Sequence, residues 1–130
     1  MKKKLPRISV FKKAVWKICS EFIRKRDCPN GVGRCFTCLV TITYSECDAG
    51  HWIHGNTKAT WLLEENIHAQ CKRCNLYLSG NGTIYTLKMI DLYGREKCDE
   101  LIKLSKTEHV FNRKELQERL EYYQKKLSTE

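Results

Sequence analysis

The chain has 130 residues, of which 42% are hydrophobic and 30% are charged. This composition is typical of a soluble globular protein and excludes a disordered chain, and the length fits a single domain over residues 1–130 with a modest core. No apolar run approaches the ~20 residues that cross a bilayer, and the lysine-rich start lacks the apolar core of a signal peptide. We therefore expect no membrane association and a cytoplasmic location.

The net charge of +9 is concentrated near the start of the chain. Residues 1–26 hold ten Lys or Arg and one acidic residue, Glu21, whereas the rest of the chain holds 14 basic and 14 acidic residues. A basic block of this kind suits a polyanion such as nucleic acid, because neutralising phosphates releases counterions. The alternative is a solvated face that only aids solubility.

A helix is predicted from Ser9 to Arg26, within a basic amphipathic segment over residues 1–27. Its apolar residues recur at helical spacing at Phe11, Val15, Ile18 and Phe22. Its basic residues on the opposite side are Lys13, Lys17 and Arg24. We expect the apolar side to pack on the domain and the basic side to contact phosphates.

The middle of the chain alternates loop and strand signals. DCPNGVGR, residues 27–34, is rich in Pro, Gly and Asn and predicts a loop. LVTITY, residues 39–44, predicts a strand because β-branched and aromatic residues favour strands, and HWIHG, residues 51–55, is compatible with a second short strand. ATWLLEEN, residues 59–66, fits a strand or a helix equally well.

Residues 83–130 are predicted to be helical. One helix ends at Gly94, and the next places Leu101 and Leu104 inward. Asn112 is a predicted N-cap of the last helix, with Glu115 completing a capping box. The stripe of this last helix comprises Leu116, Leu120, Tyr123 and Leu127. We favour core packing for this stripe over a dimer interface.

Two cysteine pairs predict a structural zinc site. Cys35 and Cys38 form one pair, and Cys71 and Cys74 form the other, with 32 residues between the two pairs. Each pair places two thiolates on one ion, and two pairs complete the tetrahedral four-sulfur set that zinc prefers. Such a site leaves no coordination position for water or substrate, so any catalytic metal must be a different ion.

The other cysteines do not have this spacing. Cys28 and Cys47 are treated as free thiols, although either is an alternative member of the zinc set. Cys19 and Cys98 fall in predicted helices and are expected in the core.

The order of these elements carries a resemblance to known nucleases. DAGHWIHG and ENIHAQCKRCN, with their zinc pairs, resemble the HNH form of the ββα-metal nuclease fold, in which a zinc clamp often braces a hairpin and helix around a catalytic divalent ion. WKICSEFIRKRD, CFTC and NIHAQCKRCNLYLSGN resemble the phage NinG (Rap) family, which is associated with recombination and cleavage of branched DNA. The asparagine after the last zinc cysteine is similar to that of recombination endonuclease VII, although Leu78 stands where that nuclease has an acid.

The resemblance implies roles for particular residues. His51 would be the general base that activates water, Asn66 would hold the hairpin loop, and Asn75 would bind Mg²⁺ or Mn²⁺. HNH nucleases often carry an acid or a histidine before the general base, but Gly50 stands there, so Asp48 is the candidate second ligand. Additional residues beside the site are Lys72 and Arg73 as phosphate contacts, and His54 and His68 as alternative ligands or phosphate contacts.

Together these features predict an α+β, mainly helical fold with a zinc-braced ββα-metal core over residues 35–82, preceded by the basic helix and followed by helices over residues 83–130. The resemblance implies a metal-dependent endonuclease of branched DNA such as Holliday junctions. The alternatives are a zinc-braced DNA-binding module without catalysis and an HNH nickase of ordinary duplex. A nuclease that makes paired cuts would most simply be a homodimer.

Overall fold

The computed structural model describes residues 5–129, so the first four residues of the basic segment and Glu130 lie outside the described part of the chain. The helices are α1 (Ile8–Asp27), α2 (Gly82–Tyr93), α3 (Arg95–Ser105) and α4 (Arg113–Ser128). The strands are β1 (Val32–Arg34), β2 (Thr41–Thr43), β3 (Asp48–His51) and β4 (Ile67–Gln70). None of the helices within residues 5–129 has the length and apolar character needed to cross a membrane.

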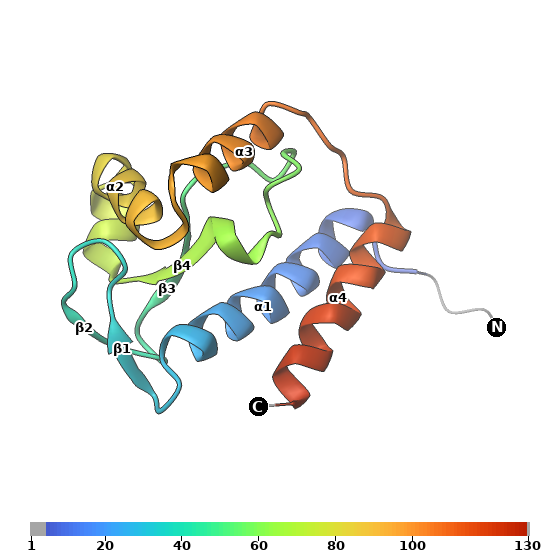
Figure 1. Ribbon diagram of the computed structural model, residues 1–130. Coiled ribbons are helices and arrows are strands. Elements are labelled where there is room, and N and C mark those ends of the chain that lie inside the picture. The colour runs from blue at the N-terminus through green and yellow to red at the C-terminus, as the bar shows by residue number, and fades with distance from the viewer. Residues whose placement is uncertain (1–4, 130) are drawn as a thin grey trace.

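Helices α1 and α4 lie side by side on one side of the β3–β4 ribbon, and α2 and α3 lie on the other side (Figure 1). The first core cluster forms where α1 meets α4 and the ribbon, and its fully buried side chains include Val15, Cys19, Ile23, Ile67, Leu116 and Tyr123. The Tyr123 hydroxyl donates a hydrogen bond to the Leu62 carbonyl, which ties α4 to the loop before β4. The predicted core role of the α4 stripe is confirmed.

The last helix begins as its sequence predicts. The Asn112 side chain accepts a hydrogen bond from the Glu115 backbone N–H, and the Glu115 carboxylate accepts one from the Asn112 backbone N–H. This reciprocal pairing satisfies two backbone donors that a helix start leaves unpaired.

Strands β3 and β4 form an antiparallel ribbon that pairs Asp48 with Gln70, Gly50 with His68 and His51 with Ile67. Successive side chains of a strand point to opposite faces. Asp48 and Gln70 therefore share one face of the ribbon, whereas His51 and Ile67 share the other, which packs against α1. The ribbon's backbone thus separates Asp48 from His51.

Two expectations about local structure are wrong. Residues 32–34, predicted as loop, form β1 and pair with β2, because Gly31 turns the chain at φ 82° and the partner strand supplies the backbone hydrogen bonds. Leu104, predicted to be inward, is 41% exposed. The buried residues of α3 are Cys98, Leu101 and Ser105, and their spacing defines a face to which position 104 does not belong.

Residues 51–66 show less regular structure than the predicted strands. Strand β3 ends at His51, so most of HWIHG is loop. ATWLLEEN forms turns followed by a short 3-10 helix, Glu64–Asn66, rather than a strand or an α-helix. The ribbon is therefore a hairpin with a long connection, and this connection reaches the His51 side chain.

Candidate functional site

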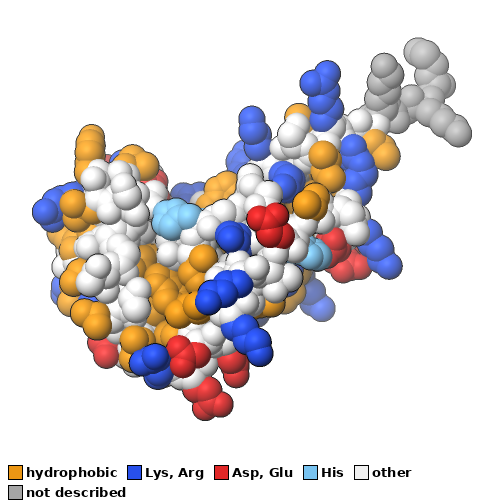
Figure 2. Space-filling model, turned by 90° about the horizontal axis from the view of Figure 1, so that it is seen from above, with side chains coloured by type: hydrophobic (Ala, Val, Ile, Leu, Met, Phe, Trp, Pro, Cys, Tyr) orange, Lys and Arg blue, Asp and Glu red, His pale blue; other side chains and the backbone are white. Residues whose placement is uncertain are grey.

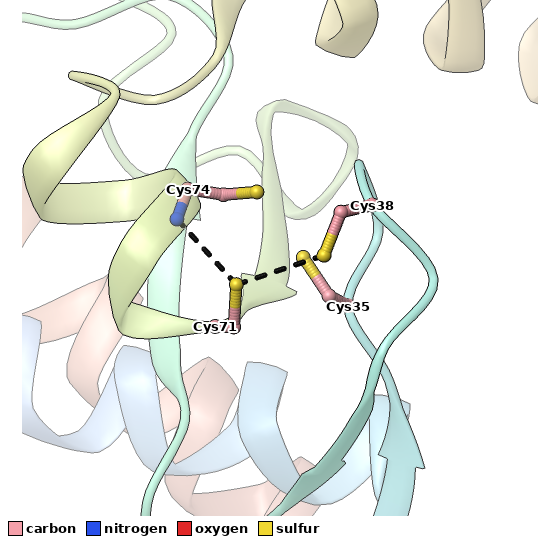
Figure 3. A group of neighbouring side chains, drawn as sticks. All are labelled: Cys35, Cys38, Cys71 and Cys74. Atoms are coloured by element: carbon pink, nitrogen blue, oxygen red, sulfur yellow. Dashed lines mark hydrogen bonds between the residues drawn. The ribbon is translucent and has the colours of Figure 1, made fainter.

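The four predicted zinc cysteines converge in space. Their sulfur atoms all lie within 4.8 Å of one another, and Figure 3 shows them facing a common centre, with Cys35 and Cys38 from the turn between β1 and β2 and Cys71 and Cys74 from the segment after β4. Four sulfurs at this separation could hold a metal such as zinc, which binds thiolates tetrahedrally. The donor set is complete, so a zinc ion held there is structural.

Backbone groups favour a thiolate at Cys35, one of the four cysteines of this centre. Burial by itself raises the pKa of Cys35, but the backbone N–H groups of Cys38 and Cys71 and the Thr37 hydroxyl lower this pKa to about 6. Burial, followed by the neighbouring sulfurs of Cys35, Cys71 and Cys74, raises the pKa of Cys38 to about 12. A bound dication offsets the repulsion among the thiolates, which is the reason the cluster suits a metal.

The His51 imidazole is oriented by its surroundings. Its Nε2 lies 2.8 Å from the Trp61 carbonyl oxygen, and its ring stacks on Trp16 at 4.7 Å between centroids. A carbonyl only accepts, so Nε2 carries the hydrogen, and a neutral ring then has its free lone pair on Nδ1. Burial lowers the pKa of His51 below 6.5. The hydrogen bond to the Trp61 carbonyl acts against this by raising the pKa, and the charge of His54 lowers it further. His51 is therefore a neutral base near pH 7.

Asn66 holds the connection between the two strands. Its Oδ1 accepts from the Ile53 backbone N–H at 2.9 Å, and its Nδ2 donates to the carbonyls of Ile53 and Thr60 at 2.9 and 3.1 Å. The side chain is fully buried. These bonds fix the loop on which Trp61 presents its carbonyl to His51.

Replacing Asn66 should disorder this loop. In Asn66→Ala, the Ile53 N–H and carbonyl lose their partner, while the Thr60 carbonyl keeps only its bond from the Leu63 N–H, and each unsatisfied group costs about 1–3 kcal/mol. We expect a loss of at least about 2 kcal/mol in the free energy of unfolding, measured by urea denaturation. Asn112→Ala at the cap of α4 is the control, with an expected loss of about 1 kcal/mol. Equal losses in the two variants would contradict the role of Asn66.

Asp48, the first residue of β3, lies beside Asn75, which directly follows the second cysteine pair. The Asn75 Nδ2 donates to Asp48 Oδ2 at 3.1 Å, and the Lys72 ammonium lies 2.7 Å from Asp48 Oδ1. Asn75 stands on a five-residue π-helical turn, Arg73–Tyr77. Carboxylate and amide oxygens are the ligands that hard cations such as Mg²⁺ prefer, and the ammonium provides the positive charge here.

His51 and Asn75 line two different hollows, which share Trp16 as a wall. The first is lined by Ser9, Lys12, Lys13, Trp16, His51, Asn56 and Trp61. The second is lined by Trp16, Ser20, Arg24, Ser45, Cys47, Asp48, Ala49, Lys72, Asn75 and Leu76. The structure thus brings Asp48 to Asn75 but does not place either against the His51 ring. A phosphate that reaches both would lie beside Trp16.

The side chains predicted to contact phosphates differ in their exposure to solvent. Lys13 and Lys17 are exposed on α1, and Arg73 is exposed on its turn. Arg24 is half-buried, since its guanidinium stacks on the Tyr44 ring at 4.7 Å and donates to the Tyr44 carbonyl at 3.2 Å. On the face shown in Figure 2, blue Lys and Arg side chains are spread around an apolar hollow rather than gathered in one patch.

His68 is a structural residue rather than a ligand. The Tyr85 hydroxyl donates to the Gly50 carbonyl at 2.7 Å, so His68 Nδ1 must donate to the Tyr85 oxygen at 3.0 Å, and His68 Nε2 accepts from the Tyr93 hydroxyl at 2.9 Å. Burial lowers the pKa of His68 to about 3. Both ring nitrogens are in use, which leaves none for a metal. His54, in contrast, is exposed near His51, with 6.5 Å between ring centroids.

Several site residues were missed in the sequence. Residue spacing did not indicate Trp16, Lys12 or Trp61, although Lys12 Nζ lies 5.3 Å from the Trp61 ring centroid in the His51 hollow. Gln70 has no such signal in its own spacing either. The strand alternation was an available signal, since it places Gln70 on the face of Asp48 once the ribbon register is known.

The remaining cysteines agree with the sequence analysis. Cys19 and Cys98 are buried in separate core clusters. Cys28 and Cys47 are buried near the four-cysteine cluster without belonging to it, and all eight thiols are free of disulfides.

Comparison with known proteins gives one consistent family. The family model described as "Bacteriophage Lambda NinG protein" matches residues 1–129. Protein ninG of Escherichia phage lambda is 40% identical over 81 residues, covering 60% of this chain and 36% of the relative. Protein ninG of Enterobacteria phage H19B is 39% identical over 85 residues, covering 62% and 38%. The chain thus spans little more than a third of the length of these relatives. No solved structure matches.

Proposed function

The chain belongs to the Bacteriophage Lambda NinG protein family, and from this premise we propose that it is a metal-dependent endonuclease that cleaves branched DNA such as Holliday junctions during phage recombination. The proposal includes an HNH-type ββα core, in which β3 and β4 are followed by the second cysteine pair and the helical turn at Asn75. The four clustered cysteines, here called the cysteine clamp, brace this core. The orientation of His51 is the single observation that carries it.

His51 has the properties of a general base for hydrolysis. Its Nε2 hydrogen is held by the Trp61 carbonyl, and within residues 5–129 its Nδ1 has no hydrogen-bond partner. A neutral imidazole can take a proton from water as that water attacks a phosphate. The adjacent lysines of the same hollow, Lys12 and Lys13, would hold the phosphate by charge.

Asp48 and Asn75 are the residues proposed to hold the catalytic Mg²⁺ or Mn²⁺. Their oxygens match the ligand chemistry of a hard cation, and the cation would supply charge stabilisation at the phosphate. Lys72 must leave Asp48 Oδ1 for the cation to bind there, and its released ammonium would then be available to contact DNA. Zinc at the four cysteines would hold β1 and β2 against the turn that carries Asn75.

The remaining basic residues would contact the backbone of DNA. Lys13 and Lys17 project from α1, and Arg73 projects near Asn75. Arg24 reaches the Asp48 hollow from the packed position described above. Phosphate contacts position a duplex without reading its bases, which suits recognition of DNA shape.

The pH dependence of cleavage should report His51. Only the unprotonated ring accepts a proton, so the single-turnover rate should rise with pH and level off. Because burial lowers the pKa of His51, the midpoint of this rise should fall below 6.5. Rates measured at saturating Mg²⁺ from pH 5 to pH 8 give the midpoint. A rate that falls over this range, or a midpoint above 6.5, would contradict the assignment.

The decisive test compares labelled four-way junctions with matched linear duplex in the presence of Mg²⁺, Mn²⁺, Zn²⁺ or no added metal. We expect cleavage of the junction with Mg²⁺ or Mn²⁺ and little cleavage of the linear duplex. Equal cleavage of both substrates would identify a nickase of ordinary duplex. Binding of the junction without cleavage under all these conditions would identify a DNA-binding module and refute the nuclease.

A further inference from the structure

Gln70 is a fully buried polar residue whose amide has a fixed orientation. Its Nε2 donates to the Gly80 carbonyl at 2.9 Å and to Thr37 Oγ1 at 3.1 Å. A carbonyl only accepts hydrogen bonds, so the nitrogen of the amide must face Gly80. The side-chain oxygen, Oε1, is therefore the atom on the other side, and within residues 5–129 it has no hydrogen-bond partner.

This unpartnered oxygen points to Gly50. A Cβ atom built on Gly50 would lie 1.9 Å from Gln70 Oε1 and 3.0 Å from Asn75 Oδ1. Both oxygens thus approach the space that the missing side chain of Gly50 leaves open. The register of the ribbon also pairs Gln70 directly with Asp48, on the same face.

Asn75 is oriented toward the same space. Its Nδ2 donates to Asp48 Oδ2 at 3.1 Å, so its Oδ1 is the atom that remains on the Gly50 side. Two amide oxygens therefore converge beside a carboxylate. Buried oxygens are almost always paired with a donor or an ion, and a divalent cation is the partner that accepts several oxygens at once.

We propose that the Gln70 side-chain oxygen is a ligand of a divalent cation held with Asp48 and Asn75. This inference rests on the cation site of the proposed function and adds a residue to it. Gly50 is required because any larger residue would occupy the position of the Gln70 oxygen. Through Thr37, whose Oγ1 lies 3.3 Å from Cys35 Sγ, Gln70 also connects this cation to the cysteine clamp.

The test measures Mn²⁺ binding to the zinc-loaded chain by isothermal titration calorimetry, independently of cleavage. Gln70→Met removes the oxygen at similar length, and Gly50→Ala displaces it without altering Gln70. Both variants should weaken Mn²⁺ binding about tenfold or more. Gln117→Met is the matched control, because it makes the same change of side chain at an exposed position of α4, and it should bind Mn²⁺ as wild type does. Zinc content and circular dichroism verify folding.

Asp48→Asn separates the inference from the proposed function. If Asp48→Asn weakens Mn²⁺ binding while folded Gln70→Met and Gly50→Ala bind as wild type does, the Gln70 assignment is wrong and the proposed function stands. If wild type binds no Mn²⁺, the cation site of the proposed function and the Gln70 assignment both fail.

A measurement on wild type covers the case in which the variants do not fold. Glutamine labelled with ¹³C at the side-chain carbonyl marks Gln70 together with Gln117 and Gln124, which both stand on α4. Electron–nuclear double resonance on the Mn²⁺ complex should show a strong ¹³C coupling from a directly bound amide. Absence of this coupling in the Mn²⁺-bound protein would overturn the proposal.

Discussion

His51→Ala is expected to reduce the rate of junction cleavage by about 10²–10⁴-fold, the usual contribution of a positioned general base. The variant loses the Nδ1 atom that would take the proton from water, while the basic residues of α1 and the cysteine clamp remain. Junction affinity should therefore stay close to that of wild type. Single-turnover cleavage and electrophoretic binding of the same labelled junction give the two quantities.

The control for His51 is its exposed neighbour. His54→Ala removes an imidazole 6.5 Å away that makes no hydrogen bond within the described part of the chain, so its cleavage rate should stay within a few-fold of wild type. His51→Gln guards against a packing effect, because it retains a polar side chain beside Trp16 but provides no base. Full cleavage activity in folded His51→Ala would refute the assigned role.

Cys74→Ser is expected to abolish zinc binding and unfold the domain. Cys74 is fully buried within the sulfur cluster, and a serine hydroxyl is a poor ligand for zinc. Zinc bound to a site of this kind contributes directly to folding, and the whole stability of a domain is only about 5–15 kcal/mol. The clamp also joins the β1–β2 turn to the segment carrying Asn75, so the cation site should be lost too.

The matched control for the clamp is Cys98→Ser. Cys98 is equally buried but lies in the separate cluster of α2 and α3, so its replacement should keep one zinc per chain and cost about 1–2 kcal/mol. Elemental analysis and thermal denaturation measure both variants. A folded, metal-free Cys74→Ser protein, or folded wild type without zinc, would contradict a structural zinc site.

Residue spacing was informative wherever the chemistry is local. The two cysteine pairs predicted the sulfur cluster, because a tight turn brings two thiolates to one ion regardless of the surrounding fold. Helical periodicity predicted α1 and α4, and the Asn112 capping box formed as expected. The sequence also indicated that the proposed nuclease chemistry must use a metal other than the one held by the four cysteines, since four thiolates leave no coordination position for water or substrate.

Short elements and partly buried residues were harder to predict. Strand β1 has three residues, and their extended conformation depends on hydrogen bonds to β2 rather than on their own propensity. Leu104 and Arg24 were both assigned from a helical wheel, which gives relative directions but not the surfaces that neighbours cover. Leu104 faces solvent, and Arg24 packs on the ring of Tyr44, 20 residues away.

The sequence by itself determined the cysteine clamp, the long helices and the candidates His51, Asn66 and Asn75. Only the tertiary structure decided how those candidates relate to one another. The ribbon register puts His51 and Asp48 on opposite faces, Trp16 separates their hollows, and the Gln70 oxygen fills the space beside Gly50. The reason is that Asp48 and Gln70, 22 residues apart, meet through strand pairing. A residue pattern encodes the periodicity of its own strand but not the register of the partner strand.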